Sequence, residues 1–335
     1  MSRLNFQHQQ HAHCESGVTA NLLRHEGLQQ ITEPLAFGIG AGLFFAHIPF
    51  LKVSGTPGTT FRSLPGSIFK RVTKSLDIDV HTQRFSTPGK AMAALDEVLE
   101  SGKPAGMLSS VYYLPYLPEA FRFHFNAHNL IAFGKENGVY NISDPVLEDV
   151  ATILPEDLAK ARFAKGTPEP KGFMYYVKNV PANLDLAGAI QRGIKKNCFL
   201  ILSPPLPWFG VNAIFLLSKK IRKYPQQLTE RKAQLYLGNI IRMQEEIGTG
   251  GAGFRFLYAA FLQESAEILK RDDLKGFAHE LTAIGDEWRH FAYSAARQMK
   301  ARKTDLVSFD ELGDMLHSIG MKEKDFFTRL NKIKW

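Results

Sequence analysis

Cysteine is scarce in this chain, with only Cys14 and Cys198 among 335 residues. Two cysteines far apart do not form the dense pattern of a small disulfide-stabilised secreted domain, and they favour a reducing compartment. The first thirteen residues also lack the apolar segment that a secretion signal carries. We therefore expect a cytoplasmic protein that is stabilised by packed cores.

Long uncharged apolar segments are scarce as well. One exception, residues 198–217, carries no charge and approaches the length of a bilayer span. Pro204, Pro205 and Pro207 interrupt it, and prolines in the middle would break a spanning helix. We predict two buried segments joined by a proline turn, with peripheral contact between an apolar surface and lipid as the alternative left open.

Negative charge is in deficit, which leaves a formal net charge of +8. The basic residues cluster late in the chain, at Lys219, Lys220, Arg222, Lys223, Lys322, Lys324, Lys332 and Lys334. No recognised nucleic-acid-binding motif accompanies them, so we expect no nucleic-acid partner. An acidic protein partner, an anionic lipid surface or a plain solvated face would each suit this charge.

The pattern of secondary-structure signals changes near residue 180. Before it, helix signals at 14–26 and 87–104 alternate with strand signals such as 172–180. After it, helical spacing dominates the segments 184–196, 211–223, 228–247, 252–271, 273–300 and 308–332. The length also suits two domains. We predict an α+β domain over residues 1–180, followed by an all-helical domain over residues 181–335.

Residues 128–145, HNLIAFGKENGVYNISDP, have the pattern of a β-hairpin. An apolar run is followed by a turn at Glu136-Asn137-Gly138 and a returning strand, Val139–Ile142. A tight hairpin returns the chain beside its start. We therefore expect His128 and Asp144 to be neighbours.

Cys14 stands at the expected start of the first helix. The partial positive charge of a helix N-terminus stabilises a thiolate, and so the pKa of a thiol there should fall. A nearby imidazole could shuttle the proton, and a carboxylate could fix the tautomer of that imidazole. The order Cys14, His128, Asp144 is the order of papain-like enzymes.

Three segments carry a resemblance to known families. HCESGVTANLLRHEGL, FGIGAGLFF and HNLIAFGKENGVYNISDP resemble the N-terminal domain of the butirosin-biosynthesis protein H family. The His…Asp-Pro hairpin also resembles the bacteriocin-processing cysteine peptidases. EEIGTGGAGFRFLYAAFLQE, with the later Trp288, is similar to the uncharacterised helical domain usually fused to the butirosin-type domain.

This resemblance implies a papain-like fold and an acyltransferase activity. An acyl group would arrive as a thioester on an acidic acyl carrier protein, pass to the cysteine, and then pass to an amine or hydroxyl of a small natural-product precursor. The carrier would bring its own phosphopantetheine, and the enzyme would need no cofactor. The helical domain would shape the acyl or acceptor pocket.

By the same resemblance, Cys14 is expected as nucleophile, His128 as base and Asp144 as orienting acid. Papain-like enzymes often place a glutamine shortly before the cysteine as an oxyanion donor. The candidates for that role here are Gln7, Gln9 and Gln10. The backbone N–H of Cys14 could supply a second donor.

The other histidines near these positions leave alternatives open. His8, His11 and His13 with Cys14 are zinc-ligand types, but their spacing matches no common zinc motif and we expect no metal. His13 could shape the site or face away. His124 competes with His128 as base, and could line the acceptor pocket instead.

The stretch IGTGGAGFR is the second candidate site. It lacks the Lys-Ser/Thr of a phosphate-binding loop and follows no strand, so a nucleotide site is disfavoured. Gly250 and Gly251 could let a substrate approach closely, and Arg255 could bind its carboxylate or phosphate. A packed bend between two helices is the alternative.

Two rival functions use the same sequence features. A cysteine peptidase or thioesterase would employ the same three residues with water as acceptor. A non-catalytic module that binds a carrier protein would keep the fold without needing Cys14. These patterns do not identify the acyl chain or the acceptor. They also do not determine whether the product is an ester or an amide, or what the oligomeric state is.

Overall fold

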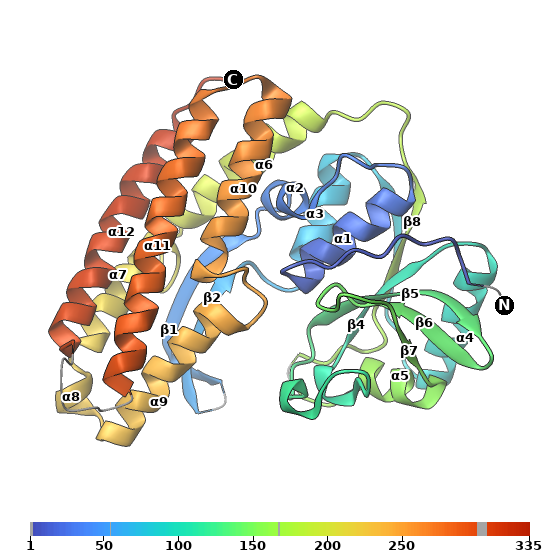
Figure 1. The fold of residues 1–335 in the computed structure, drawn as a ribbon, viewed down its shortest axis with the longest axis horizontal. Helices are drawn as coiled ribbons and strands as arrows, with labels where there is room; N and C mark the ends of the chain where they lie inside the picture. Colours follow the sequence, from blue (N-terminus) through green and yellow to red (C-terminus); the bar gives the residue numbers. More distant parts are fainter. Residues whose placement is uncertain (1–2, 54, 167, 300–306) are drawn as a thin grey trace. The chain divides into compact units, whose positions relative to one another are not determined.

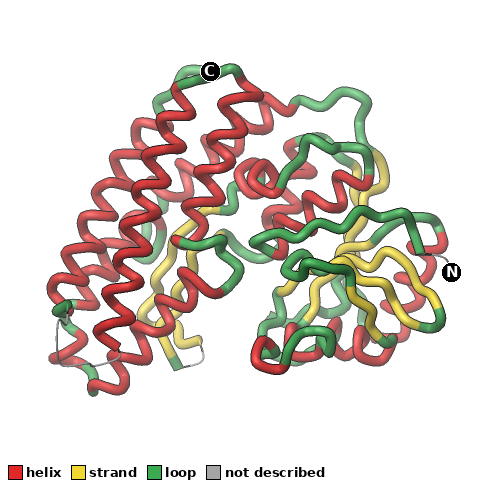
Figure 2. The backbone as a smooth tube through the Cα atoms, viewed as in Figure 1, coloured by secondary structure: helices red, strands yellow, loops and turns green. Residues whose placement is uncertain are grey.

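The computed structural model describes residues 3–53, 55–166, 168–299 and 307–335. The chain divides into two compact units, each assembled from two stretches of sequence: unit 1 is Met1–Ala36 with Ile68–Asp185, and unit 2 is Phe37–Ser67 with Leu186–Trp335. Unit 1 mixes strands with helices, whereas unit 2 is mainly helical (Figures 1 and 2). The α+β class of the first domain and the helical class of the second are confirmed.

Unit 1 is built on a six-stranded sheet with strand order β3-β8-β4-β5-β6-β7, and all its neighbouring strands are antiparallel. The strands are β3 (Asp79–Gln83), β4 (Ala105–Ser109), β5 (His128–Glu136), β6 (Val139–Ser143), β7 (Ala151–Ile153) and β8 (Met174–Asn179). All of β4 and the first seven residues of β5 are buried. Side chains in the centre of this sheet are therefore covered on both faces.

Helices cover both faces of this sheet (Figure 1). They are α4 (Pro88–Glu100) and α5 (Pro155–Arg162) on one face, and α1 (Cys14–His25) and α3 (Ser67–Ser75) on the other. Leu130 of β5 packs with Leu95 of α4, while the next residue, Ile131, packs with Val18 of α1. The alternation of side chains along a strand thus places Leu130 and Ile131 in opposite helical layers.

Helix α1 begins at Cys14, as the sequence predicted. His13 precedes it with extended backbone, and its side chain accepts a hydrogen bond from the Ser16 backbone N–H. Arg24 and His25 stand in the last turn, where cationic groups suit the helix dipole. The cap fixes the cysteine as the first residue of the helix.

The predicted hairpin is confirmed as β5 and β6. Its turn residues, Asn137 and Gly138, have φ values of 50° and 81°, which only glycine and a few polar residues adopt readily. Ile131 pairs with Ser143, so Asp144 leaves β6 close to the start of β5.

Unit 2 contains the helices α6 (Leu186–Leu202), α7 (Gly210–Ile221), α8 (Tyr224–Gln227), α9 (Glu230–Ile241), α10 (Arg255–Leu269), α11 (Asp273–Met299) and α12 (Phe309–Asn331). The apolar run 198–217 falls into the end of α6, a proline-containing connection and most of α7, as predicted. Within the described residues, no helix combines the length and apolar character needed to cross a membrane.

The structure differs from the expected division at residue 180 because Phe37–Ser67 groups with unit 2. This segment contains the hairpin β1 (Leu43–Val53) and β2 (Thr56–Arg62). Phe45 of β1 and Phe61 of β2 both contact the ring of Trp288 on α11. A segment can therefore join a core formed by residues more than 200 positions later, and local patterns do not reveal such a partner.

This packing predicts unequal effects at two phenylalanines of β1. Phe45 is fully buried, whereas Phe50 is 68% exposed. Phe45→Ala should lower the free energy of unfolding by about 3 to 5 kcal/mol because it leaves a cavity, and Phe50→Ala by about 1 kcal/mol or less. Chemical denaturation measures both changes, and equal small losses would contradict the burial of β1 in unit 2.

Candidate active site

Cys14 occupies the first position of α1 and is only 7% exposed. The N-terminus of the helix brings its partial positive charge to this position. Such a position favours the anionic form of a thiol. Neither Cys14 nor Cys198 takes part in a disulfide.

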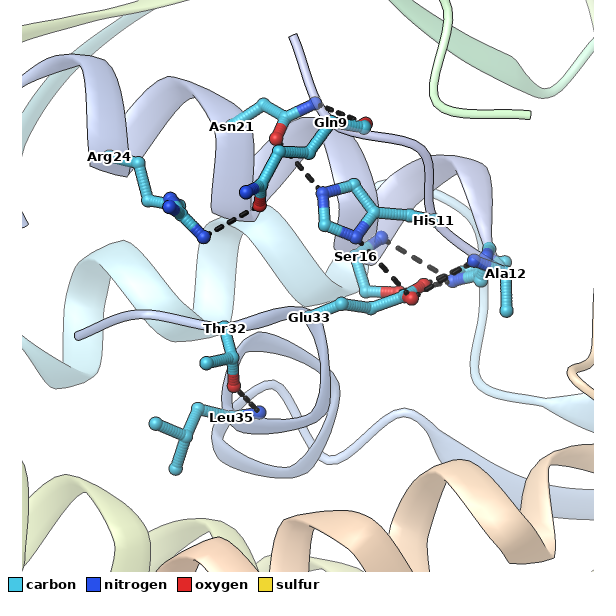
Figure 3. Close-up of polar contacts among 10 residues, drawn as sticks. Gln9, His11, Ala12, Ser16, Asn21, Arg24, Thr32, Glu33 and Leu35 are labelled. Carbon is cyan, nitrogen blue, oxygen red and sulfur yellow. Dashed lines mark hydrogen bonds and ion pairs between the residues drawn. The ribbon is translucent and has the colours of Figure 1, made fainter. Parts of the chain in front are cut away.

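The loop before Cys14 is held by one carboxylate, that of Glu33 at the start of α2 (Glu33–Ile39). Its two oxygens accept hydrogen bonds from the backbone N–H groups of Ala12 and His13 at 2.9 and 2.7 Å. It also accepts one from Ser16 Oγ at 3.1 Å, and Figure 3 shows the Glu33 side chain directed at this loop. Glu33 therefore fixes the backbone immediately ahead of the cysteine.

His128, at the start of β5, lies between a carboxylate and the thiol. Its Nε2 is 2.8 Å from Asp144 Oδ2, and both side chains are buried. Burial alone would lower the pKa of His128, but the charge and hydrogen bond of Asp144, and then those of Cys14, raise it above its ordinary value. Because Nε2 is hydrogen-bonded to Asp144, the other ring nitrogen, Nδ1, is the one available to the cysteine thiol. The site therefore favours imidazolium facing a thiolate.

Asp144 follows β6 directly and is fully buried. Besides His128, Oδ2 accepts a hydrogen bond from the Tyr116 hydroxyl at 2.9 Å, and Oδ1 accepts one from the Val146 backbone N–H at 3.2 Å. Burial and the charge of Asp144 raise the pKa of Tyr116 well above its usual range, so the phenol stays a donor. These donors offset the cost of burying a carboxylate.

The arrangement suits nucleophilic catalysis by cysteine. A thiolate can attack an acyl carbon, and the adjacent imidazolium can protonate the leaving group. Asp144 keeps the imidazole oriented throughout. The catalytic roles of these three residues remain predictions, but the structure brings their side chains into one buried cluster.

Sequence reasoning missed several polar residues of this cluster. Tyr116 and Glu33 carry no local signal, because nothing in their own segments indicates which group they will contact. Asn129 was also missed, although it follows His128; its Nδ2 lies 3.9 Å from Cys14 Sγ. The alternation of β5 places Asn129 on the face covered by α1, and this signal could have identified it.

Of the two histidines considered as pocket residues, His124 is exposed and His13 is buried. Strand β5 begins at His128, so it does not extend to His124, which is exposed and stacks on Tyr112 with ring centroids 4.1 Å apart. His13 is buried, and its Nδ1 lies 2.9 Å from Ser16 Oγ. His13 therefore caps α1 rather than lining an open pocket.

Gln7, Gln9 and Gln10 are all exposed, and the side chains of Gln9 and Gln10 form hydrogen bonds. Gln9 Oε1 accepts a hydrogen bond from Arg24 at 2.6 Å, which directs the Gln9 side chain toward the last turn of α1 (Figure 3). Gln10 Nε2 donates to the Val146 carbonyl at 3.4 Å. Gln9 is thus a poor oxyanion donor in this conformation, and the role of Gln10 stays a prediction.

The second candidate site is corrected by the structure. Arg255 is completely buried, and its Nε and a terminal nitrogen donate to the two carboxylate oxygens of Glu323 at 2.8 and 3.0 Å. Gly250 and Gly251 have φ values of 65° and 90° in the bend before α10. A guanidinium already paired in a core is not available to a substrate, so the packed-bend alternative is the right one for Arg255.

The histidines considered as zinc ligands have separate hydrogen-bonding partners. His8 Nδ1 lies 2.7 Å from Ser143 Oγ, and His11 Nε2 lies 2.9 Å from Asn21 Oδ1. In the part of the chain that the structure describes, no three His, Cys, Asp or Glu side chains gather as a metal site would need.

Two family models match the chain. Residues 13–145 match the model described as butirosin biosynthesis protein H, N-terminal, and residues 156–330 match a domain of unknown function, DUF4872. The second match covers over half of the chain. The chain therefore belongs to the DUF4872 family. Its N-terminal part is similar to the N-terminal domain of butirosin biosynthesis protein H.

Comparison with solved structures gives a distant likeness. A crystal structure described as a C39-like peptidase from Bacillus anthracis is 16% identical, with a TM-score of 0.38, over 54% of this chain and 100% of that one. Among curated proteins, none matches the chain.

The cluster predicts that Asp144→Asn makes Cys14 harder to ionise. Without the carboxylate charge the pKa of His128 falls, the imidazolium is lost, and the thiolate loses its counter-ion. The pH midpoint of Cys14 alkylation by iodoacetamide should rise by about one unit or more. Intact-mass spectrometry measures the extent of Cys14 alkylation at each pH.

Two internal controls belong to this experiment. Burial raises the pKa of Cys198 to about 12, so it should not react near neutral pH. Asp96→Asn changes a carboxylate that bonds Lys135 and Tyr140 instead, and it should keep the wild-type profile. An unchanged profile in Asp144→Asn would contradict the coupling of the three side chains.

Proposed function

We propose that the protein is an acyltransferase that carries an acyl group on Cys14. The thiolate attacks the carbonyl carbon of an acyl thioester, and His128 gives its proton to the departing thiol. An amine or hydroxyl then attacks the acyl-enzyme and yields its proton to His128, which restores the thiolate. Asp144 orients the imidazole in both steps.

The observation that carries this proposal is the 2.8 Å contact between His128 Nε2 and Asp144 Oδ2 beside a cysteine at a helix N-terminus. It leaves Nδ1 for proton exchange with the thiol. The backbone N–H of Cys14, at the start of α1, would serve as an oxyanion donor.

An acyl carrier protein is the proposed acyl donor. The match to the butirosin-type N-terminal model supports this choice. The net charge of +8 also supports it, because carrier proteins are acidic and a basic enzyme would attract them. The carrier would deliver the thioester on its phosphopantetheine, and the enzyme would supply no cofactor. The acceptor would be a small molecule of a natural-product pathway.

The test is detection of the acyl-enzyme by intact mass after incubation with a synthetic acyl-pantetheine thioester. Wild type and Cys198→Ala should each gain one acyl mass, and Cys14→Ala should gain none. His128→Gln should acylate about a hundredfold or more slowly because it lacks the proton carrier. No adduct in wild type, or the same adduct in Cys14→Ala, would contradict the proposal.

A second step separates transfer from hydrolysis. When a small amine or alcohol is added to the acyl-enzyme, an acylated acceptor supports the transferase. Release of free acid at the same rate with and without acceptor would instead indicate a thioesterase or peptidase. A protein that binds a carrier but never forms an adduct would be a binding module.

A further inference from the structure

A second polar group reaches Cys14 from the sheet. The amide of Asn129 is 1% exposed, and its Nδ2 lies 3.9 Å from Cys14 Sγ and 3.3 Å from the Ala127 carbonyl oxygen. Its Oδ1 accepts a hydrogen bond of 2.7 Å from the Tyr175 hydroxyl. The Tyr175 hydroxyl thus donates to the Asn129 amide, and that amide in turn faces the sulfur of Cys14.

Packing of α1 on β5 brings the amide to the thiol. Val18 and Leu22 of α1 share one apolar cluster with Ile131 of β5. Cys14 stands one helical turn before Val18, and Asn129 stands two residues before Ile131 on the same strand face. Cys14 and Asn129 therefore lie next to the apolar contact between α1 and β5, at the ends where the helix and the strand begin.

Tyr175 reaches Asn129 because the neighbouring strand has no side chain in its way. Gly106 of β4 pairs with Tyr175 of β8, and a Cβ at Gly106 would lie 2.4 Å from the tyrosine ring. Burial first, and then the charges of Glu15 and Cys14, raise the pKa of Tyr175 well above its usual range. The phenol therefore stays neutral and donates its proton to Asn129 Oδ1.

That bond determines which way the amide faces. Since Oδ1 accepts from Tyr175, the NH₂ end points to the sulfur and to the Ala127 carbonyl, which accepts one of its protons. The other proton is available to the thiolate. A thiolate that is 7% exposed has little water around it, so each donor from the protein matters more than it would on the surface.

We propose that Asn129 is a further catalytic residue, whose amide N–H donates to the Cys14 thiolate, and that Tyr175 is a positioning residue, which holds the amide in that orientation. This inference rests on the proposed role of Cys14 as the nucleophile. Asn129 supplies a neutral donor in addition to the imidazolium of His128. The thiolate then has two donors, both before it attacks and when it is expelled from the acyl-enzyme.

The test is the pH profile of Cys14 alkylation by iodoacetamide in the full-length protein, followed by intact mass. Asn129→Leu keeps the size of the side chain and removes the donor, and it should raise the midpoint by about one pH unit, a tenfold change in thiolate at a given pH. Tyr175→Phe should shift the midpoint in the same direction by less. The double variant should match Asn129→Leu alone, because Tyr175 acts through the amide.

Matched controls come from the neighbouring strand β6. Tyr140→Phe removes a buried hydroxyl that bonds Asp96, and Asn141→Leu removes an amide that bonds Glu136. Both should keep the wild-type profile. A shift in Asn129→Leu that these controls reproduce would mean a general loss of packing, and it would overturn the assignment.

The outcomes for the two proposals are distinct. A wild-type Cys14 that reacts like an ordinary exposed thiol contradicts its role as nucleophile. A readily ionised wild-type Cys14 together with an unchanged midpoint in folded Asn129→Leu overturns the role of Asn129 alone. If Asn129→Leu does not fold, Tyr175→Phe decides, since it removes one oxygen atom only: an unchanged midpoint there overturns the inference.

Discussion

The buried hydrogen bond between His128 and Asp144 is the interaction on which the site depends. A carboxylate without water around it is costly unless several donors surround it, and Asp144 has three: the imidazole, the Tyr116 hydroxyl and the Val146 backbone N–H. Burial would lower the pKa of His128, but the charge and hydrogen bond of Asp144 raise it above its ordinary value. We propose that the resulting imidazolium favours ionisation of the Cys14 thiol.

Two local structures deliver the reacting groups to each other. The hairpin of β5 and β6 brings the histidine and the aspartate together across a turn of two left-handed residues. The first turn of α1 supplies the cysteine, and Glu33 fixes the loop ahead of it through two backbone N–H groups. Apolar packing of α1 on β5 then sets the distance between the two structures. Rigid supports of this kind are what a nucleophile and its base need, because small displacements weaken proton transfer.

The sequence predicted those parts of the structure whose causes are local. The start of α1, the Asn137-Gly138 turn and the capped helix α4 each depend on a few consecutive residues, and each was found where expected. The position of Phe37–Ser67 in unit 2 could not be predicted, because its partner Trp288 lies far along the chain. The same reason hid Tyr116 and Glu33. The role of Arg255 stayed open between two alternatives, because a sequence does not show that a charged side chain will meet Glu323 inside a core.

The protonation state of His128 tests this account most directly. Nitrogen-15 NMR of the labelled protein reports whether one or both ring nitrogens carry a proton, and His128→Gln identifies the signal. We predict an imidazolium at pH 8 in the wild type, because Asp144 and the Cys14 thiolate raise the pKa of His128. We predict a neutral ring at the same pH once Asp144 is replaced by asparagine. A wild-type His128 that is already neutral at pH 7 would contradict the account.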